Sequence, residues 1–207
     1  MQMNGAIGGF YRLCDWIMKL AYINILWISF SLLGLIVFGL FPATAAMFVI
    51  VRKILMDKDE IPILKTFWES YKSEFLKSNI LGLILIITGY ILYIDILFLR
   101  NTTGFINLLY YPTLVLALGF VLTLLYVFPT FVHFDQRILQ VIKNAFVIML
   151  MNPLSTVLMV IGSFAVYLLM TTIPGLIPLF SGSILSFVIM WASFFAFSRL
   201  KKIQDAA

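Results

Sequence analysis

The sequence predicts an all-α fold: a polytopic transmembrane helical bundle of about five spans with amphipathic interfacial helices. Of its 207 residues, 63% are hydrophobic and 11% are charged, whereas a soluble domain carries about 25% charged residues. The mean hydropathy of +1.09 describes more apolar surface than a chain of this size buries in water. We therefore expect residues 1–207 to form a single integral membrane domain whose solvent is the lipid bilayer.

Five runs that are uncharged or nearly so predict the spans, because about 20 apolar residues cross the hydrocarbon core. The first run starts after Lys19, and we end it before Pro42, because proline disfavours helix at the preceding residue. Pro174 and nearby glycines divide the charge-free run 144–198 into the last two spans. The predicted spans are 21–40, 80–99, 106–132, 154–172 and 183–197.

Residues 43–55 follow the first span and are too short to cross the membrane again. We expect a helix that either lies at the interface or re-enters the membrane against the bundle. Lysine and arginine concentrate in residues 52–77, 137–143 and 199–202, which the positive-inside rule places in the cytoplasm. Five crossings then put the N-terminus outside, whereas a re-entrant segment returns it to the cytoplasm.

Residues 62–79 predict an amphipathic cytoplasmic helix. Apolar side chains recur at helical spacing opposite charged ones such as Lys65 and Glu69. Such a helix either lies on the inner leaflet with its aromatic rings among the headgroups, or serves as a docking surface for a partner. The candidate docking residues are Phe67, Trp68, Tyr71 and Phe75, together with Pro42 in the turn after the first span.

Residues 135–151 form a more apolar counterpart, with Asp135 as the expected N-cap. Phe41-Pro42 and Phe128-Pro129 each precede one of these two segments. This arrangement predicts a weak internal repeat, although Phe-Pro pairs also arise by chance in a chain that holds 20 phenylalanines.

Asp95 is the candidate intramembrane polar residue, because an ionisable group within a span is costly and usually faces a cavity or a partner. It lies near the end of the second predicted span, close to Arg100. Two interpretations remain open. Asp95 either reaches water or Arg100 at the interface, or it lines a path for a substrate or a proton.

We expect no catalytic residue, no metal and no cofactor, and therefore not an enzyme. Cys14 and His133 are single residues of their type, which excludes an internal disulfide and a histidine-pair metal site. His133 and Asp135 are two positions apart and would face different sides of a helix. The net charge of +5 comes from scattered basic residues rather than a basic stripe, so we expect no nucleic-acid binding.

Three motifs resemble the YesL-like family of bacterial membrane proteins of unknown function. They are GLFPATAAMF at residues 39–48, VRK at 51–53 and TFWESYKSEF at 66–75. The likeness extends over essentially the whole chain. It implies a multi-pass protein of the bacterial cytoplasmic membrane, often encoded near carbohydrate ABC importers, and it supplies no established site residues.

The resemblance and the amphipathic helix together lead to a functional expectation. We expect an accessory or regulatory subunit associated with carbohydrate uptake, which contacts permease or ATPase subunits of an ABC-type importer through residues 62–79 and Pro42. The alternative is a small oligomeric transporter or channel that acts by itself, with Asp95 lining its path.

Overall fold

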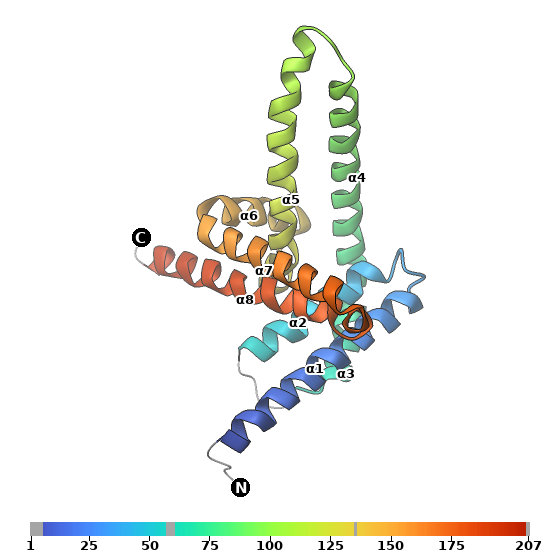
Figure 1. Cartoon of the computed structure of the whole chain (residues 1–207), viewed down its shortest axis with the longest axis vertical. Helices are drawn as coiled ribbons and strands as arrows, with labels where there is room; N and C mark the ends of the chain where they lie inside the picture. Colours follow the sequence, from blue (N-terminus) through green and yellow to red (C-terminus); the bar gives the residue numbers. More distant parts are fainter. Residues whose placement is uncertain (1–5, 57–60, 135, 206–207) are drawn as a thin grey trace.

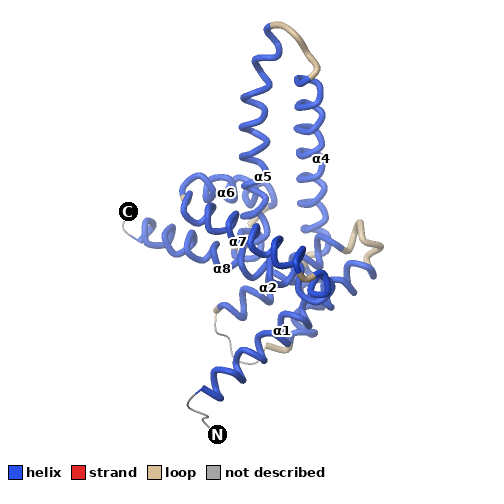
Figure 2. The backbone as a smooth tube through the Cα atoms, in the orientation of Figure 1, coloured by secondary structure: helices blue, strands red, loops and turns tan. Residues whose placement is uncertain are grey.

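The computed structural model describes residues 6–56, 61–134 and 136–205 (Figure 1). Within these ranges every regular element is a helix, and Figure 2 shows the helices joined by short loops. The elements are, in chain order, α1 (Ala6–Leu33), α2 (Leu40–Leu55), α3 (Ile63–Ser73), α4 (Phe75–Arg100), η1 (Phe105–Leu109), α5 (Tyr110–His133), α6 (Ile138–Met151), α7 (Pro153–Thr172), η2 (Pro174–Leu176) and α8 (Ile177–Asp205). The predicted all-α helical bundle is confirmed.

Among the described residues, five stretches are long and apolar enough to cross a membrane, which makes the chain a multi-pass membrane protein. They are Cys14–Leu33, Phe75–Arg100, Ile106–His133, Pro153–Thr172 and Pro174–Arg199. The number agrees with the sequence-based prediction. The bounds of the third and fourth are nearly those expected, whereas the second and fifth are longer.

The first span ends earlier than predicted, because α1 stops at Leu33 and α2 begins at Leu40. Pro42 lies in the first turn of α2. Backbone N–H groups have no intrahelical acceptor there, so proline removes no hydrogen bond. The prediction that the first span covers 21–40 and ends because of Pro42 is therefore wrong: the proline starts the second helix.

The chain reverses over residues 34–39, where two glycines let backbone touch backbone. A Cβ atom on Gly34 would lie 2.2 Å from the Cα of Gly39, a distance that no larger residue tolerates. Beyond this turn α2 runs back along α1, and Nε1 of Trp27 donates a hydrogen bond to Oγ1 of Thr44 at 3.0 Å. The two helices form an antiparallel hairpin.

Helix α2 occupies the centre of the molecule, where it contacts α1, α3, α4, α5 and α8. Eight of its 16 residues are buried. They are Pro42, Ala43, Ala45, Ala46, Met47, Phe48, Ile50 and Val51. A helix lying at the membrane surface would leave one face exposed, so residues 43–55 instead form a helix buried against the bundle.

Helix α2 crosses the base of the hairpin formed by α4 and α5. Phe41 packs against Gly82 of α4, and Phe48 stacks on Phe128 of α5 with 5.7 Å between ring centroids. Figure 1 shows the rest of the hairpin standing away from the other helices. Most of its large apolar side chains are exposed there.

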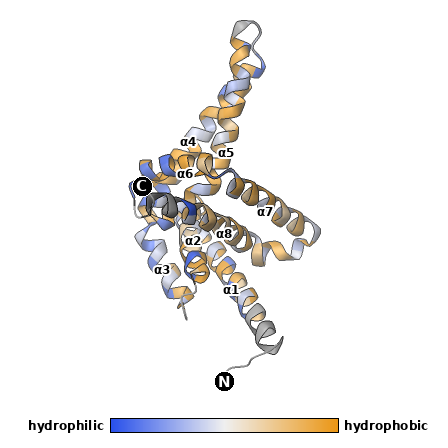
Figure 3. Cartoon of the chain, turned by 90° about the vertical axis from the view of Figure 1, so that its left-hand side faces the viewer, coloured by the Kyte–Doolittle hydropathy of each residue, from blue (hydrophilic) through white to orange (hydrophobic). Residues whose placement is uncertain are grey.

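Helices α7 and α8 form a second apolar hairpin, and a Cβ atom on Gly162 of α7 would lie 2.4 Å from Cγ1 of Val188 of α8. Helix α8 also packs along α1 and α2. Figure 3 shows hydrophobic residues along α7 and hydrophilic ones on α3. Several large apolar side chains of α7 are exposed, among them Leu154, Ile161 and Phe164, as expected for a helix that contacts lipid.

The predicted amphipathic helix over 62–79 is wrong at its C-terminal end. Helix α3 ends at Ser73, and Glu74 (φ −97°, ψ 3°) separates it from α4, which begins at Phe75. The break lets α4 leave in a new direction, so residues 75–79 belong to the long apolar helix.

The counterpart segment 135–151 forms α6, which begins at Ile138 with Arg137 as its N-cap. Asp135, the predicted N-cap, lies outside the described residues.

The two Phe-Pro pairs occupy different structural positions. Phe41-Pro42 opens α2, whereas Phe128-Pro129 lies inside α5 near its C-terminal end. The internal repeat inferred from these pairs is therefore wrong.

Candidate functional site

The structure divides the five predicted docking residues into buried and exposed ones. Phe67 is completely inaccessible, Tyr71 is buried in the same cluster, and Pro42 is buried in α2. Trp68 is 43% exposed and Phe75 is 37% exposed. Only these last two side chains offer surface to a partner, and Phe75 belongs to α4.

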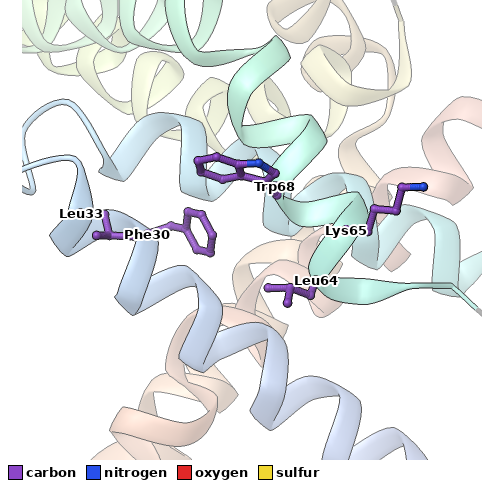
Figure 4. A pocket seen from close by; sticks show the side chains of 5 residues that line it. All are labelled: Phe30, Leu33, Leu64, Lys65 and Trp68. Carbon is purple, nitrogen blue, oxygen red and sulfur yellow. The ribbon is translucent and has the colours of Figure 1, made fainter.

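An apolar hollow opens beside Trp68, between the end of α1 and helix α3 (Figure 4). Its volume is about 480 Å³. It is lined by Phe30 and Leu33 of α1 and by Leu64, Lys65 and Trp68 of α3. We call it the Trp68 hollow. Leu64 and Trp68 reach it together because residues four apart lie on one helix face.

Aromatic packing under the hollow holds α3 against α1. The ring of Phe30 lies 5.0 Å from Phe67 and 5.5 Å from Trp68 between centroids, within the range of favourable aromatic pairs. The hydroxyl of Tyr71 donates a hydrogen bond to the carbonyl oxygen of Phe30 at 3.3 Å. Burial raises the pKa of Tyr71, which keeps this donor protonated.

The exposed edge of the hollow is cationic. Nζ of Lys72 lies 4.3 Å from the centroid of the Trp68 ring, which is a cation–π contact, and Lys65 is one of the residues that line the hollow. The site therefore combines an apolar floor, a half-exposed tryptophan and two ammonium groups. It suits recognition of an apolar or acidic surface.

Asp95 lies on the distal half of α4 with its side chain exposed. Among the described residues it has no hydrogen bond and no ion pair, and the pairing with Arg100 does not form. Asp95 does not face the interior of this chain. A path lined by Asp95 would need a second protein chain to enclose it.

Sequence reasoning missed a polar contact where α2, α5 and α8 meet. Nη1 of Arg52 donates to the carbonyl oxygen of Val132 at 2.6 Å, and the ring of His133 stacks on Phe197 at 4.5 Å between centroids. Arg52 and Val132 are 80 positions apart, and His133 and Phe197 are 64 positions apart, so no local sequence pattern predicts these contacts. These contacts bring together the C-terminal parts of α2, α5 and α8. A basic segment lies within or directly after each of these three helices.

No cluster of metal ligands forms within the part of the chain that the structure describes: no three His, Cys, Asp or Glu side chains gather there. His133 has no carboxylate partner among those residues, and Asp135 is not one of them.

The family described as "Protein of unknown function, DUF624" matches residues 20–96. These residues run from α1 into α4 and include the Trp68 hollow, the turn at 34–39 and Asp95. No solved structure matches the chain at a significant level.

Three curated proteins of Bacillus subtilis (strain 168) are similar over nearly the whole chain. Uncharacterized protein YteU is 40% identical over 187 residues, which cover 90% of this chain and 84% of that protein. Uncharacterized protein YesL is 36% identical over 205 residues, or 99% and 97% of the two chains. Uncharacterized protein YesV is 36% identical over 195 residues, or 94% and 92%. The chain therefore belongs to the YesL-like, DUF624 family of proteins of unknown function.

Proposed function

We propose that this chain is a non-catalytic subunit of the bacterial cytoplasmic membrane that binds another membrane protein complex at the Trp68 hollow. The observation that carries the proposal is the exposed Trp68 beside an apolar hollow on the charged helix α3. Tryptophan is enriched among the residues that dominate binding energy, because it buries a large area in a single rigid ring. The hollow offers such a ring together with space beside it for a partner side chain.

The carbohydrate importer is the partner class that we propose, and it rests on the family resemblance alone. Its permease subunits lie in the same membrane, and its ATPase subunits lie on the cytoplasmic side to which we assign the basic helix α3. A regulatory or accessory role is compatible with the described residues, among which no three His, Cys, Asp or Glu side chains gather.

A pull-down with matched tryptophan variants tests the proposal. Trp191 of α8 is 45% exposed, close to the exposure of Trp68, and lies outside the hollow. The tagged chain is isolated in a mild detergent from its bacterial host during carbohydrate uptake. We expect wild type and Trp191→Ala to recover importer subunits and Trp68→Ala to lose them.

A photo-crosslinking residue at Leu64, which lines the hollow, is compared with one at Leu139 of α6, which is also exposed. We expect a crosslink to a permease or ATPase subunit from position 64 only. If wild type recovers no such subunit, or if Trp68→Ala recovers as much as wild type, the proposed function is refuted.

A homo-oligomeric transporter is the second candidate, and the observation that favours it is Asp95, which is exposed and has no ion pair among the described residues. An ionisable side chain on a lipid-facing helix is costly unless a partner or a water-filled path shelters it. Packing of two α4–α5 hairpins against each other would bring two Asp95 side chains to such a path.

A further inference from the structure

The turn at residues 34–39 and the end of α1 before it expose an unusual concentration of large apolar side chains. Leu35 is 80% exposed, and five other large apolar side chains here are more than half exposed. The exposed residues are Leu32, Leu33, Leu35, Ile36, Val37 and Phe38. No charged residue occurs between Lys19 and Arg52. A turn in water normally carries glycine, asparagine, aspartate or serine instead, so this surface is made for an apolar environment.

Most backbone N–H groups of the turn donate hydrogen bonds to nearby backbone carbonyl oxygens. Six N–H groups, those of residues 34–38 and 40, donate to backbone carbonyl oxygens at 2.7 to 3.2 Å. All of the acceptors lie within residues 30–36. Nδ2 of Asn79 in α4 also donates to the carbonyl oxygen of Phe38 at 3.0 Å. Irregular backbone is excluded from hydrocarbon because unpaired N–H groups are costly there. This turn largely avoids that cost.

Two residues of the turn hold a backbone conformation that favours glycine. Leu35 has φ 56° and Ile36 has φ 63°, and for a β-branched side chain a positive φ is rare and strained. Glycine would form the same turn without strain. The presence of a leucine and an isoleucine there indicates that their side chains, and not only the turn, are needed.

The returning arm of the hairpin, α2, is too short to cross a bilayer, although Cys14–Leu33 of α1 is long and apolar enough to do so. The uncharged part of α2, residues 40–51, is about 18 Å long at about 1.5 Å per residue, against a hydrocarbon core of about 30 Å. Lys19 pairs with Asp15 at 2.6 Å, and because α1 and α2 are antiparallel these charges lie at the same end as Arg52. Both polar ends therefore belong on one side of the membrane.

We propose that residues 34–39 are embedded in the acyl chains of the cytoplasmic leaflet, so that α1 and α2 form a re-entrant hairpin with both ends in the cytoplasm. The turn lies beside Asn79, in the second turn of α4, which places it in the leaflet where α4 enters the membrane. Helices α4, α5, α7 and α8 then provide four crossings, and Cys14–Leu33 enters the membrane without crossing it. Every basic segment of the chain, including Lys19, is cytoplasmic in this arrangement, as the positive-inside rule requires.

Single-cysteine labelling tests the topology on the full chain. Cys14 is the only native cysteine, so Cys14→Ser provides the background for Gln2→Cys, Ile36→Cys, Met56→Cys and Leu108→Cys. Each variant is treated with a membrane-impermeant maleimide, in intact cells and in inverted vesicles. We expect positions 2 and 56 to react only in inverted vesicles, position 108 only in cells, and position 36 in neither.

Lipid contact is measured separately on purified protein in proteoliposomes. No other protein is present there, so the turn can be covered only by lipid or by a second copy of this chain. An environment-sensitive fluorophore attached to the Ile36→Cys variant should emit at shorter wavelength than one attached to the Met56→Cys variant. Phospholipids that carry a quencher on the acyl chain should also quench the fluorophore at position 36 more strongly than the fluorophore at position 56. If Ile36→Cys does not fold, Val37→Cys replaces it.

Each other result overturns the proposal. Labelling of position 36 in intact cells would mean that the hairpin crosses the membrane, and labelling in inverted vesicles would mean that the turn is a cytoplasmic loop. A third result is that position 36 is not labelled, its fluorophore is not quenched by lipid, and crosslinks form between two copies. This result would mean that protein rather than lipid covers the turn.

Discussion

Asn24 of α1 accepts a hydrogen bond from the backbone N–H of Gly182 of α8 at 2.9 Å, although the two residues are 158 positions apart. The same amide accepts from the N–H of Ser183 at 3.1 Å and donates to the carbonyl oxygen of Pro178 at 2.8 Å. Pro178 and Gly182 are four residues apart, the spacing at which a helix pairs its own donors and acceptors. Asn24 is completely buried, so one side chain fixes how α1 docks on the start of α8.

Replacement of Asn24 by alanine should destabilise the folded protein. Hydrogen bonds between membrane helices contribute about 0.6 kcal/mol on average and up to about 1.7 kcal/mol. Loss of the three bonds should therefore cost about 2 kcal/mol and lower the unfolding temperature in detergent. Ser29→Ala, on an exposed position of the same helix, is the control. Equal unfolding temperatures for the two variants would show that the Asn24 bonds do not stabilise the fold.

Alanine should have different effects on stability at two helical glycines. A Cβ atom at Gly82 would lie 2.4 Å from Cδ2 of Phe41, whereas nothing lies within 4 Å of one at Gly119. Overpacking costs about 1–3 kcal/mol, so Gly82→Ala should lower the unfolding temperature. Gly119→Ala should be neutral or raise it, because alanine is the better helix former.

The cause of the Gly82 effect can be checked by a second substitution. Phe41→Leu shortens the side chain that the new methyl group would strike, so it should recover part of the loss in the Gly82→Ala background. Without such recovery, the effect does not come from the contact between α2 and α4.

Tyr126 and Thr156 should be energetically coupled. Their hydroxyl groups lie 2.9 Å apart in the buried contact between α5 and α7. A double-mutant cycle with Tyr126→Phe and Thr156→Val should give a coupling of about 0.6–1.7 kcal/mol in the free energy of unfolding. Thr156 also donates to the Asn152 carbonyl oxygen, and the cycle cancels that separate contribution. Additive effects would mean that the two hydroxyl groups do not stabilise each other.

Asp95→Asn should leave the fold intact, because the exposed carboxylate has no partner among the described residues. Substitutions at such positions usually change stability by about 0.5 kcal/mol or less. The same variant discriminates between the two candidate functions. For a non-catalytic subunit, proteoliposomes with wild type or Asp95→Asn should leak protons no faster than empty vesicles. A proton flux with wild type that the variant abolishes would favour the oligomeric transporter.

Local patterns were enough to predict much of the fold. The spans predicted over 106–132 and 154–172 nearly coincide with helical stretches of the structure, because charge and hydropathy are properties of neighbouring residues. The break at Glu74 and the early end of α1 at Leu33 were not predictable in this way. Both depend on which helix packs next to the segment, and an uninterrupted apolar run does not show where the chain turns.

The candidate site illustrates the same limit. The periodicity of α3 identifies a face with several aromatic rings, yet Phe67 is buried and the adjacent Trp68 is exposed. The difference arises because Phe30 of α1 packs against both rings and the hollow opens only on the tryptophan side. Consecutive helical residues point about 100° apart, and only the position of the partner helix decides which of the two rings is buried.

By itself, the sequence determined that this protein is a multi-pass, all-helical membrane protein, because about 20 uncharged apolar residues in a row are stable only in lipid. Only the tertiary structure decided that α2 is buried across the base of the α4–α5 hairpin, that the chain reverses over residues 34–39, and that Trp68 is the exposed ring of its helix. Those outcomes depend on contacts such as those of Arg52 with Val132 and of Asn24 with Gly182. Helix packing brings these distant residues together, and no local sequence pattern predicts which residues will meet.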